Sequence, residues 1–278
     1  SFQMRHEIYG MVLDAVVPEV DPRAEYLAFN LRRLERCDWR DYQKSVSRTR
    51  ALVEQCLAEG LPAPLPPFKS LTLPLPPELI AAIAGSRGGF LASSMANMCQ
   101  QLAFTDRASI TSRLKIGYLS ADFRNHPTAH LMQGLFRLHD RERFEIHAYA
   151  LCKDDGSHYY QRIKADADRF IDLTDMTNAD AASRIHRDGV HILIDLMGYT
   201  AYARSEILAL RPAPVQASYL GYPGTMGASF VPYIIVDPVV LPEKLQSQFT
   251  EQPVYLPECY QVNDREQPIA VTGIGRKA

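Results

Sequence analysis

One short segment of the chain gathers residues that can move protons. Asp122, His126, Thr128 and His130 follow an apolar run over 114–119. A histidine that titrates near neutral pH can act as a general base toward a hydroxyl group or donate a hydrogen bond to a polar ligand. Asp122 can orient that imidazole or take a proton itself, and Thr128 can cap the helix that follows. Such a cluster can also serve only to tie a turn together, but its place at a strand end favours function.

Two further segments bring main-chain atoms or polar side chains to the same kind of position. Leu220–Gly227 contains three glycines around Pro223, and glycine lets a ligand approach the backbone closely. A tight turn after a strand explains this segment equally well, and it lacks the G-x-G-x-x-G fingerprint of a dinucleotide site. In the segment 195–200, Tyr199 and Thr200 can line a cleft, although a glycine turn with a packed tyrosine is an equally good explanation.

The remaining histidines and cysteines predict no metal site. His126 and His130 have no third ligand or adjacent glutamate beside them, so we expect neither a metal ion nor a cofactor. His191 begins a strand and should point to the opposite end of the sheet, away from catalysis. The five cysteines are scattered and contain no C-x-x-C pair, which argues against zinc and against a disulfide framework. Unpaired cysteines are typical of a reducing compartment, so a cytoplasmic location is expected.

The elements that must position these segments alternate between strand and helix from residue 114 onward. Apolar runs predict strands at 114–119, 144–151, 169–173, 190–196, 215–220, 233–236 and 254–256. Helical patterns lie at 128–138, 157–167, 178–187 and 203–210. Short apolar strands separated by helices indicate an α/β fold, a Rossmann-like, doubly wound parallel sheet buried on both faces. The loops that follow parallel strands emerge at one edge of the sheet, where ligands bind.

Four regions differ in composition along the chain. Residues 1–60 carry apolar residues at helical spacing and predict an α-helical region, which could be the end of a tetratricopeptide array. Residues 61–113 form a proline-rich connector with an extended path, followed by a helix from Glu78. Residues 114–260 hold the predicted sheet. The polar segment 261–278 has no periodicity and is predicted to be a linker or a disordered tail.

Length and charge narrow the class of protein further. A chain of 278 residues fits one sizeable domain plus a smaller region. The net charge of −2 gives no reason to expect nucleic acid or an anionic membrane as a partner. No run approaches the roughly 18 to 20 apolar residues that cross a bilayer, so no membrane span is expected.

Several motifs, in this order along the chain, resemble the O-GlcNAc transferase/SPINDLY family of protein O-glycosyltransferases. They are His126-Pro127-Thr128-x-His130, the segment Asp195–Thr200, Arg211-Pro212-Ala213-Pro214-Val215-Gln216 and Leu220-Gly221-Tyr222-Pro223-Gly224-Thr225. The segments 34–39 and 66–68 also resemble the stretch that precedes the catalytic core in bacterial members. The resemblance covers most of the chain, and several matching motifs are far more specific than a single loop.

The resemblance implies the N-terminal half of a GT-B core, an architecture of two Rossmann-like halves. It implies an inverting, metal-independent glycosyltransferase that moves GlcNAc from UDP-GlcNAc to Ser or Thr of intracellular proteins. By motif, His126 and Asp122 resemble the catalytic groups, and either of them can be the one that takes the proton. Thr128, His130, Leu220, Gly221 and Pro223 resemble donor-sugar contacts, and Tyr199 and Thr200 resemble the cleft wall.

The resemblance also implies partners for this chain. In the family, most diphosphate and nucleoside contacts come from the second Rossmann-like half, which should begin where this chain ends at Ala278. The chain is therefore expected to act on a nucleotide-sugar donor and a protein acceptor together with that half, and to be weakly active or inactive alone. The long tetratricopeptide array of the family is not expected within these 278 residues, except for what could be its last helices.

Three alternatives remain open at this point. A SPINDLY-like half would transfer fucose from GDP-fucose, because the donor base is recognised by the second half. A non-catalytic protein-interaction module would use the helical region as a platform. A redox enzyme with a Rossmann fold is a distant third, since no dinucleotide fingerprint exists.

Overall fold

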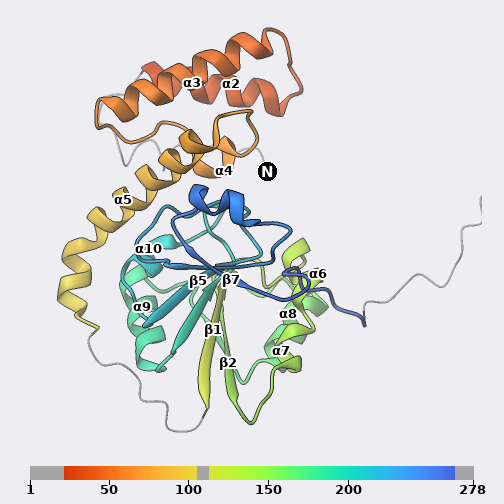
Figure 1. Cartoon of the computed structure of the whole chain (residues 1–278). Coiled ribbons are helices and arrows are strands. Elements are labelled where there is room, and N and C mark those ends of the chain that lie inside the picture. Colours follow the sequence, from red (N-terminus) through yellow and green to blue (C-terminus); the bar gives the residue numbers. More distant parts are fainter. Residues whose placement is uncertain (1–21, 105–112, 267–278) are drawn as a thin grey trace, which may run out of the picture. The chain divides into compact units, whose positions relative to one another are not determined.

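The computed structural model describes residues 22–104 and 113–266 (Figure 1). Two compact units are distinguished, Ser1–Phe90 and Leu91–Ala278, and the division falls within one long helix. The boundaries predicted after residues 60 and 113 differ from this division and stay predictions. The predicted features within residues 1–21 and 267–278 lie outside the described residues.

The first unit consists of helices around an apolar core, and the predicted helical region is confirmed. Its helices are α2 (Pro22–Glu35), α3 (Tyr42–Ala58), α4 (Pro67–Ser70) and the first part of α5 (Pro77–Leu102). Leu27, Val53, Leu65 and Ile83 are among its most buried residues. The proline-rich connector is not extended throughout, because α4 forms one turn within it. Pro67 stands at the first position of α4, where a helix needs no backbone N–H.

Helix α5 departs from one expectation of the sequence. It has 26 residues and contains an 18-residue window of mean hydropathy 1.2, so by length and composition it could cross a membrane. It is the one such helix among the described residues, and the expectation that no segment approaches this length was wrong. The large apolar residues of α5 are spaced among Ala, Gly and Ser rather than forming one unbroken run. One helix of this kind is weak evidence for a membrane, because core helices of soluble proteins share its composition.

The second unit contains a seven-stranded parallel sheet, which confirms the predicted fold class. The strands lie in the order β3-β2-β1-β4-β5-β6-β7. Their bounds are β1 (Leu114–Ser120), β2 (Phe144–Ala150), β3 (Arg169–Asp172), β4 (Ile192–Asp195), β5 (Val215–Tyr219), β6 (Tyr233–Val236) and β7 (Gln252–Tyr255). Figure 1 shows α6, α7 and α8 on one side of this sheet and α9 and α10 on the other.

The helices of this unit match the predicted segments with two differences. They are α6 (Pro127–Met132), α7 (Leu135–Leu138), α8 (His158–Asp166), α9 (Asn178–Arg187), α10 (Ser205–Ala209) and the 3-10 helix η1 (Glu243–Gln248), which was not predicted. The helix predicted over 128–138 is instead the pair α6 and α7. Gly134 separates them, and a β-carbon there would lie 2.7 Å from the carboxylate of Asp264.

Asp264 belongs to the start of the segment predicted as a linker or disordered tail. Its carboxylate lies 3.1 Å from the guanidinium of Arg162 on α8. Glu266 also pairs with Arg162 at 3.0 Å. Residues 261–266 are therefore held against the sheet domain by ion pairs, while the rest of the segment lies outside the described residues.

The strand order reverses between β1 and β4, because β2 and β3 lie on one side of β1 and β4 to β7 on the other. In the register of the sheet, Leu119 lies opposite Asp195, which lies opposite Ser218. The loops after β1, β4 and β5 therefore leave the same edge side by side. This edge is the topological switch point at which doubly wound sheets bind ligands.

Candidate active site

The carboxyl edge of the sheet brings the three predicted loops together. Asp122 follows β1, Tyr199 and Thr200 follow β4, and Leu220, Gly221 and Pro223 follow β5. The sulfur of Met197 accepts hydrogen bonds from the hydroxyl of Ser120 at 3.4 Å and from the N–H of Ala121 at 3.2 Å. These contacts fix the loop after β4 against the loop after β1.

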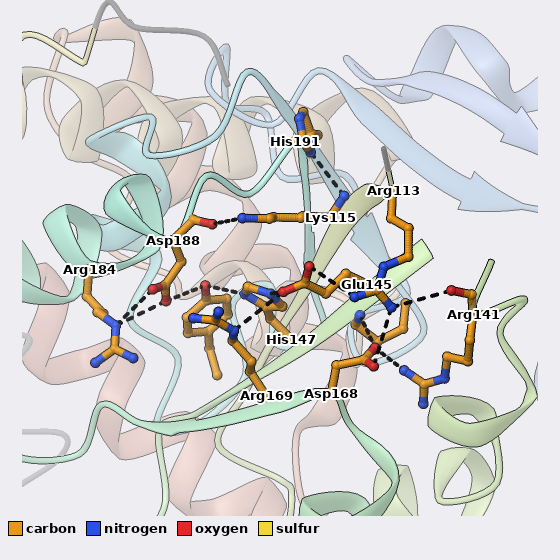
Figure 2. Close-up of polar contacts among 12 residues, drawn as sticks. Arg113, Lys115, Arg141, Glu145, His147, Asp168, Arg169, Arg184, Asp188 and His191 are labelled. Atoms are coloured by element: carbon orange, nitrogen blue, oxygen red, sulfur yellow. Dashed lines mark hydrogen bonds and ion pairs between the residues drawn. The ribbon is translucent and has the colours of Figure 1, made fainter. Parts of the chain in front are cut away.

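His191 lies at the opposite edge, as the sequence predicted. Its Nδ1 accepts a hydrogen bond from the backbone N–H of Lys115 at 3.0 Å, at the start of β1. Figure 2 shows it in that amino edge, among arginine, lysine and carboxylate side chains that pair with one another. His191 therefore cannot contact a ligand bound at the carboxyl edge.

Asp122 and His126 form a close pair beside the switch point. Oδ2 of Asp122 lies 3.4 Å from Nδ1 of His126, and the side chain of Asp122 is only 9% exposed. Burial raises the pKa of Asp122, against the lowering effect of His126 and Arg124. Burial lowers the pKa of His126, against the raising effect of Asp122. The histidine is therefore neutral at physiological pH and can accept a proton.

His126 also occupies the N-cap position of α6. Its Nδ1 lies 3.3 Å from the backbone N–H of Thr128 and can accept that hydrogen bond only when it carries no proton, and Pro127 begins the helix. The prediction that the Thr128 hydroxyl caps this helix was therefore wrong, because Thr128 is already inside its first turn. Nε2 of His126 makes no hydrogen bond within the described residues, and the side chain is 36% exposed.

Arg124 is a charged residue of this site that was not predicted from the sequence. Its Nη2 lies 3.6 Å from Oδ1 of Asp122, and its Nε donates a hydrogen bond to the carbonyl of Ala121 at 3.2 Å. The guanidinium also lies over the ring of Tyr202, 5.6 Å from its centroid. Its position between Asp122 and His126 in the sequence was the available signal.

His130 is turned toward other groups than the Asp122–His126 pair. Its Nε2 lies 2.9 Å from Oδ1 of Asn125, and its ring packs against Tyr159 at 4.2 Å between centroids. The N–H of Asn125 in turn donates to Asp155 at 2.8 Å. His130 therefore supports the shape of the loop, and contact between its ring and a donor sugar stays a prediction.

The loop after β5 approaches the loop after β4 so closely that a side chain is excluded at one position. A β-carbon on Gly221 would lie 1.8 Å from the carbonyl oxygen of Leu196. Leu220 has φ 63°, a left-handed conformation that is uncommon for a residue other than glycine. Such backbone outliers concentrate at ligand-binding and catalytic sites. The close approach at Gly221 is a contact between two loops, which also fits the tight-turn explanation, and contact of Leu220, Gly221 and Pro223 with a donor sugar stays a prediction.

Glu251 fixes the far end of this loop and was missed by the sequence analysis. Its buried carboxylate accepts hydrogen bonds from the hydroxyl of Thr225 at 2.6 Å and from the N–H of Met226 at 2.5 Å. The hydroxyl of Tyr199 donates to the carbonyl of Met226 at 2.6 Å. Thus Tyr199, predicted as part of the cleft wall, is tied to the loop after β5. No local sequence motif predicts the role of Glu251, because it lies 25 residues from its partner Met226.

Asp195 shapes the loop after β4. Its carboxylate accepts hydrogen bonds from the N–H groups of Met197 at 3.1 Å and of Gly198 at 2.8 Å. Burial raises its pKa to about 6, against these two hydrogen bonds. Thr200 closes the same turn, because its hydroxyl donates to the carbonyl of Met197 at 2.8 Å. Thr200 therefore serves the turn, and its contact with an acceptor stays a prediction.

The described residues contain no cluster of three or more His, Cys, Asp or Glu side chains that could hold a metal ion. Pro223 is exposed at the surface of the loop after β5, next to the buried Tyr222. Tyr222 packs so close to Gly198 that a β-carbon there would lie 2.3 Å from it. The three loops thus form one packed unit around the switch point.

The family model for glycosyl transferase family 41 matches residues 36–272. This chain belongs to glycosyl transferase family 41. The match includes the entire parallel sheet and all the predicted site residues. The resemblance read from the sequence motifs is thereby confirmed.

Curated relatives of this family 41 chain include peptide N-acetylglucosaminyltransferases. A Caenorhabditis elegans protein named UDP-N-acetylglucosamine–peptide N-acetylglucosaminyltransferase is 42% identical over 224 residues, which are 78% of this chain and 19% of that protein. The Arabidopsis thaliana protein SEC, named as a probable enzyme of the same kind, is 36% identical over 78% of this chain and 23% of its own length. The chain thus spans about a fifth of the length of these relatives.

SPINDLY proteins match a shorter part of the chain. The Arabidopsis thaliana SPINDLY protein is 32% identical over 142 residues, which are 50% of this chain and 16% of that protein. Among solved structures, a variant of the Thermobaculum terrenum O-GlcNAc transferase superposes with a TM-score of 0.60 at 24% identity, over 79% of this chain and 42% of that one. At that identity the likeness concerns the fold alone.

Proposed function

We propose that this chain supplies the proton-accepting and sugar-binding half of a protein O-GlcNAc transferase, which moves GlcNAc from UDP-GlcNAc to Ser or Thr of intracellular proteins. The observation that carries the proposal is the Asp122–His126 pair, 3.4 Å apart at the switch point of a family 41 sheet. On the same edge of the sheet, the loop after β5 packs so closely against the loop after β4 that Gly221 admits no side chain. An imidazole that can take the hydroxyl proton and main-chain atoms that can hold the sugar for in-line attack are two elements that favour sugar transfer to a hydroxyl.

The reaction has a simple balance of protons and electrons. The Ser or Thr hydroxyl loses its proton to Nε2 of His126 as its oxygen bonds to the anomeric carbon of the sugar. The bond between that carbon and the diphosphate oxygen breaks, and its electron pair leaves with UDP. Attack from the side opposite the leaving group inverts the anomeric centre. No metal ion or cofactor enters this scheme.

The partners follow from the same scheme. The donor's diphosphate and nucleoside require contacts beyond the three loops described above, and we propose that a second Rossmann-like half supplies them. The acceptor is a protein with an accessible Ser or Thr, and we propose that the reaction takes place in the cytoplasm. The five cysteines, all unpaired in this structure, fit a reducing compartment.

The relatives support GlcNAc as the transferred sugar. Relatives named as GlcNAc transferases match 78% of this chain, at 42% and 36% identity. The SPINDLY relative matches only half of it. Fucose from GDP-fucose is therefore the second candidate, and a non-catalytic interaction module is the third.

The test uses the native gene product that carries this chain, isolated from its source and weighed intact. Transfer of labelled sugar to protein is measured with UDP-GlcNAc and with GDP-fucose, for the wild type and for His126→Ala. Transfer of GlcNAc that His126→Ala abolishes, by a product well above the mass of this chain, supports the proposal. Transfer of fucose alone supports the SPINDLY-like alternative. A native product of this chain's own mass that neither binds nor transfers either donor contradicts both and leaves the interaction module.

A further inference from the structure

One nitrogen atom of the candidate site has two competing neighbours. Nδ1 of His126 lies 3.3 Å from the N–H of Thr128 and 3.4 Å from the carboxylate of Asp122. The N–H can only donate, so it needs Nδ1 without a proton. An ionised carboxylate can only accept, so it needs Nδ1 with a proton. The tautomer of His126 therefore depends on the charge of Asp122.

The nitrogen that carries the proton decides whether His126 can act as a base. When the pair carries one proton and Asp122 is ionised, that proton lies on Nδ1, and Nε2 keeps a lone pair that can accept a proton. When the pair carries two protons, Nε2 is protonated whether the second proton resides on the imidazole or on Asp122. In that case the exposed nitrogen can only donate a hydrogen bond, to a sugar for example, and cannot deprotonate an acceptor.

Arg124 lies where it controls this choice. Its guanidinium is on the Oδ1 side of Asp122, at 3.6 Å, while His126 is on the Oδ2 side, at 3.4 Å. The carboxylate is thus held between a fixed positive charge and a titratable ring. Because Asp122 is almost fully buried, water cannot substitute for that charge.

We propose that Arg124 is a positioning residue that keeps the Asp122–His126 pair at a single proton, held on Nδ1, so that Nε2 is the proton acceptor of the reaction. The role as base rests on the function proposed above, whereas the protonation state does not. Two contacts aim the guanidinium at Asp122. They are its hydrogen bond to the carbonyl of Ala121 and its place over the ring of Tyr202.

The charges around the pair act in the direction that the proposal requires. Arg124 lowers the pKa of Asp122 and also lowers that of His126, so it opposes a second proton at either site. His130 on α6 lowers the pKa of His126 further. Cys152 in the loop after β2 also faces Asp122, and burial raises the pKa of this thiol to about 11, so it is neutral. Among these neighbours, Arg124 is the one with a permanent charge.

Nitrogen NMR of the histidine side chains of the chain itself tests the protonation state without any activity. The signals of His126 are assigned by their loss in His126→Gln. In the wild type we expect Nδ1 protonated and Nε2 unprotonated at pH 7. Arg124→Met should move the pH at which the second proton binds upward by about one unit. Arg124→Lys should retain the wild-type value, because it keeps a positive charge.

Arg187→Met is the matched control, since Arg187 is an exposed arginine at the end of α9, which leads to the opposite edge of the sheet. It should leave the titration of His126 unchanged. The proposal is overturned if Arg124→Met leaves that titration unchanged, or if the wild type carries its proton on Nε2 at pH 7. Thermal melting of each variant identifies any that does not fold, and Arg124→Gln, which also removes the positive charge and should show the same upward shift, then replaces Arg124→Met.

The pH profile of kcat/KM tests the consequence for catalysis in the native gene product. Wild-type activity should fall off only below the ordinary histidine pKa of about 6.5. In Arg124→Met, the pH below which kcat/KM falls should be higher by about one unit. In Arg124→Lys, this pH should equal the wild-type value. An unshifted profile contradicts the role in catalysis. If the wild type transfers no sugar at all, the proposed function fails while the NMR result still decides the protonation state.

Discussion

The two edges of the parallel sheet are both rich in charged residues, but they use them differently. At the amino edge, His147 is fully buried, with Nε2 2.8 Å from Glu145 and Nδ1 3.1 Å from the hydroxyl of Tyr149. That hydroxyl donates to Asp188 at 2.9 Å. Figure 2 shows how these groups and their arginine partners pair with one another. At the carboxyl edge, His126 has both of its close polar contacts on one nitrogen.

The comparison of His147 with His126 shows which features distinguish a structural histidine from a reactive one. Both rings lie beside a carboxylate, so the pairing alone does not separate them. His147 has a partner on each nitrogen and no exposed surface, which is the arrangement of a satisfied buried polar group. Nε2 of His126 makes no hydrogen bond within residues 22–104 and 113–266, and its ring reaches solvent. The carboxyl edge also has the strained Leu220 and the close approach at Gly221.

The largest expected effect is on activity at the carboxyl edge. His126→Ala should lower the transfer rate by about 10²- to 10⁴-fold, because a general base is lost. The free energy of unfolding should fall by only about 1 kcal/mol, because the side chain of His126 is 36% exposed and its removal leaves no large cavity. Both are measured, by sugar transfer and by urea denaturation. Activity of His126→Ala within twofold of wild type would contradict the catalytic role of His126, which is what separates the carboxyl edge from the amino edge.

The reciprocal substitution at the amino edge should affect stability instead. His147→Ala should lower the free energy of unfolding by about 2–4 kcal/mol, because it leaves a cavity and removes partners from Glu145 and Tyr149. The transfer rate per folded molecule should be unchanged. Urea denaturation followed by transfer assays of the folded fraction measures both. A large loss of activity without loss of stability would contradict the structural role.

A smaller effect is expected at the close approach between two loops. Gly221→Ala places a methyl group against the carbonyl of Leu196, so the loop after β5 must move. A displacement of this kind should lower kcat/KM by about 10- to 100-fold, mainly through a higher KM for the nucleotide sugar. Gly89→Ala in α5 is the control, because a β-carbon there meets no atom within 4 Å. If both variants keep wild-type kinetics, this loop does not hold the donor.

The smallest expected effect compares two tyrosine hydroxyls. Tyr149→Phe removes the hydroxyl between His147 and Asp188 and should cost about 1 kcal/mol of stability with no change in activity. Tyr199→Phe removes the hydrogen bond to Met226 and should change KM values more than stability. Chemical denaturation and steady-state kinetics of the pair measure both quantities. Indistinguishable behaviour of the two variants would show that Tyr199 is no part of the cleft.

Much of the sheet could be read from local patterns. Six of the predicted strands overlap observed ones from β1 to β6, because most are short, largely buried apolar runs, while β3 at the edge of the sheet is largely exposed. Strand β7 was predicted two residues late, since Gln252 and Pro253 are not apolar. The helix predicted over 128–138 is interrupted at Gly134, where the absent β-carbon leaves room for the carboxylate of the distant Asp264. Local propensity carries no information about such a contact.

The candidate site divides in the same way. The sequence by itself determined that Asp122, His126 and Gly221 follow apolar strands, and parallel pairing then puts their loops on one edge. Only the tertiary structure decided that Arg124 faces Asp122, that Glu251 holds the loop after β5, and that Nδ1 of His126 has two competing neighbours. The physical reason is that strand ends follow from local burial and periodicity. Hydrogen bonds and ion pairs depend on which distant side chains the fold brings within about 3 to 4 Å.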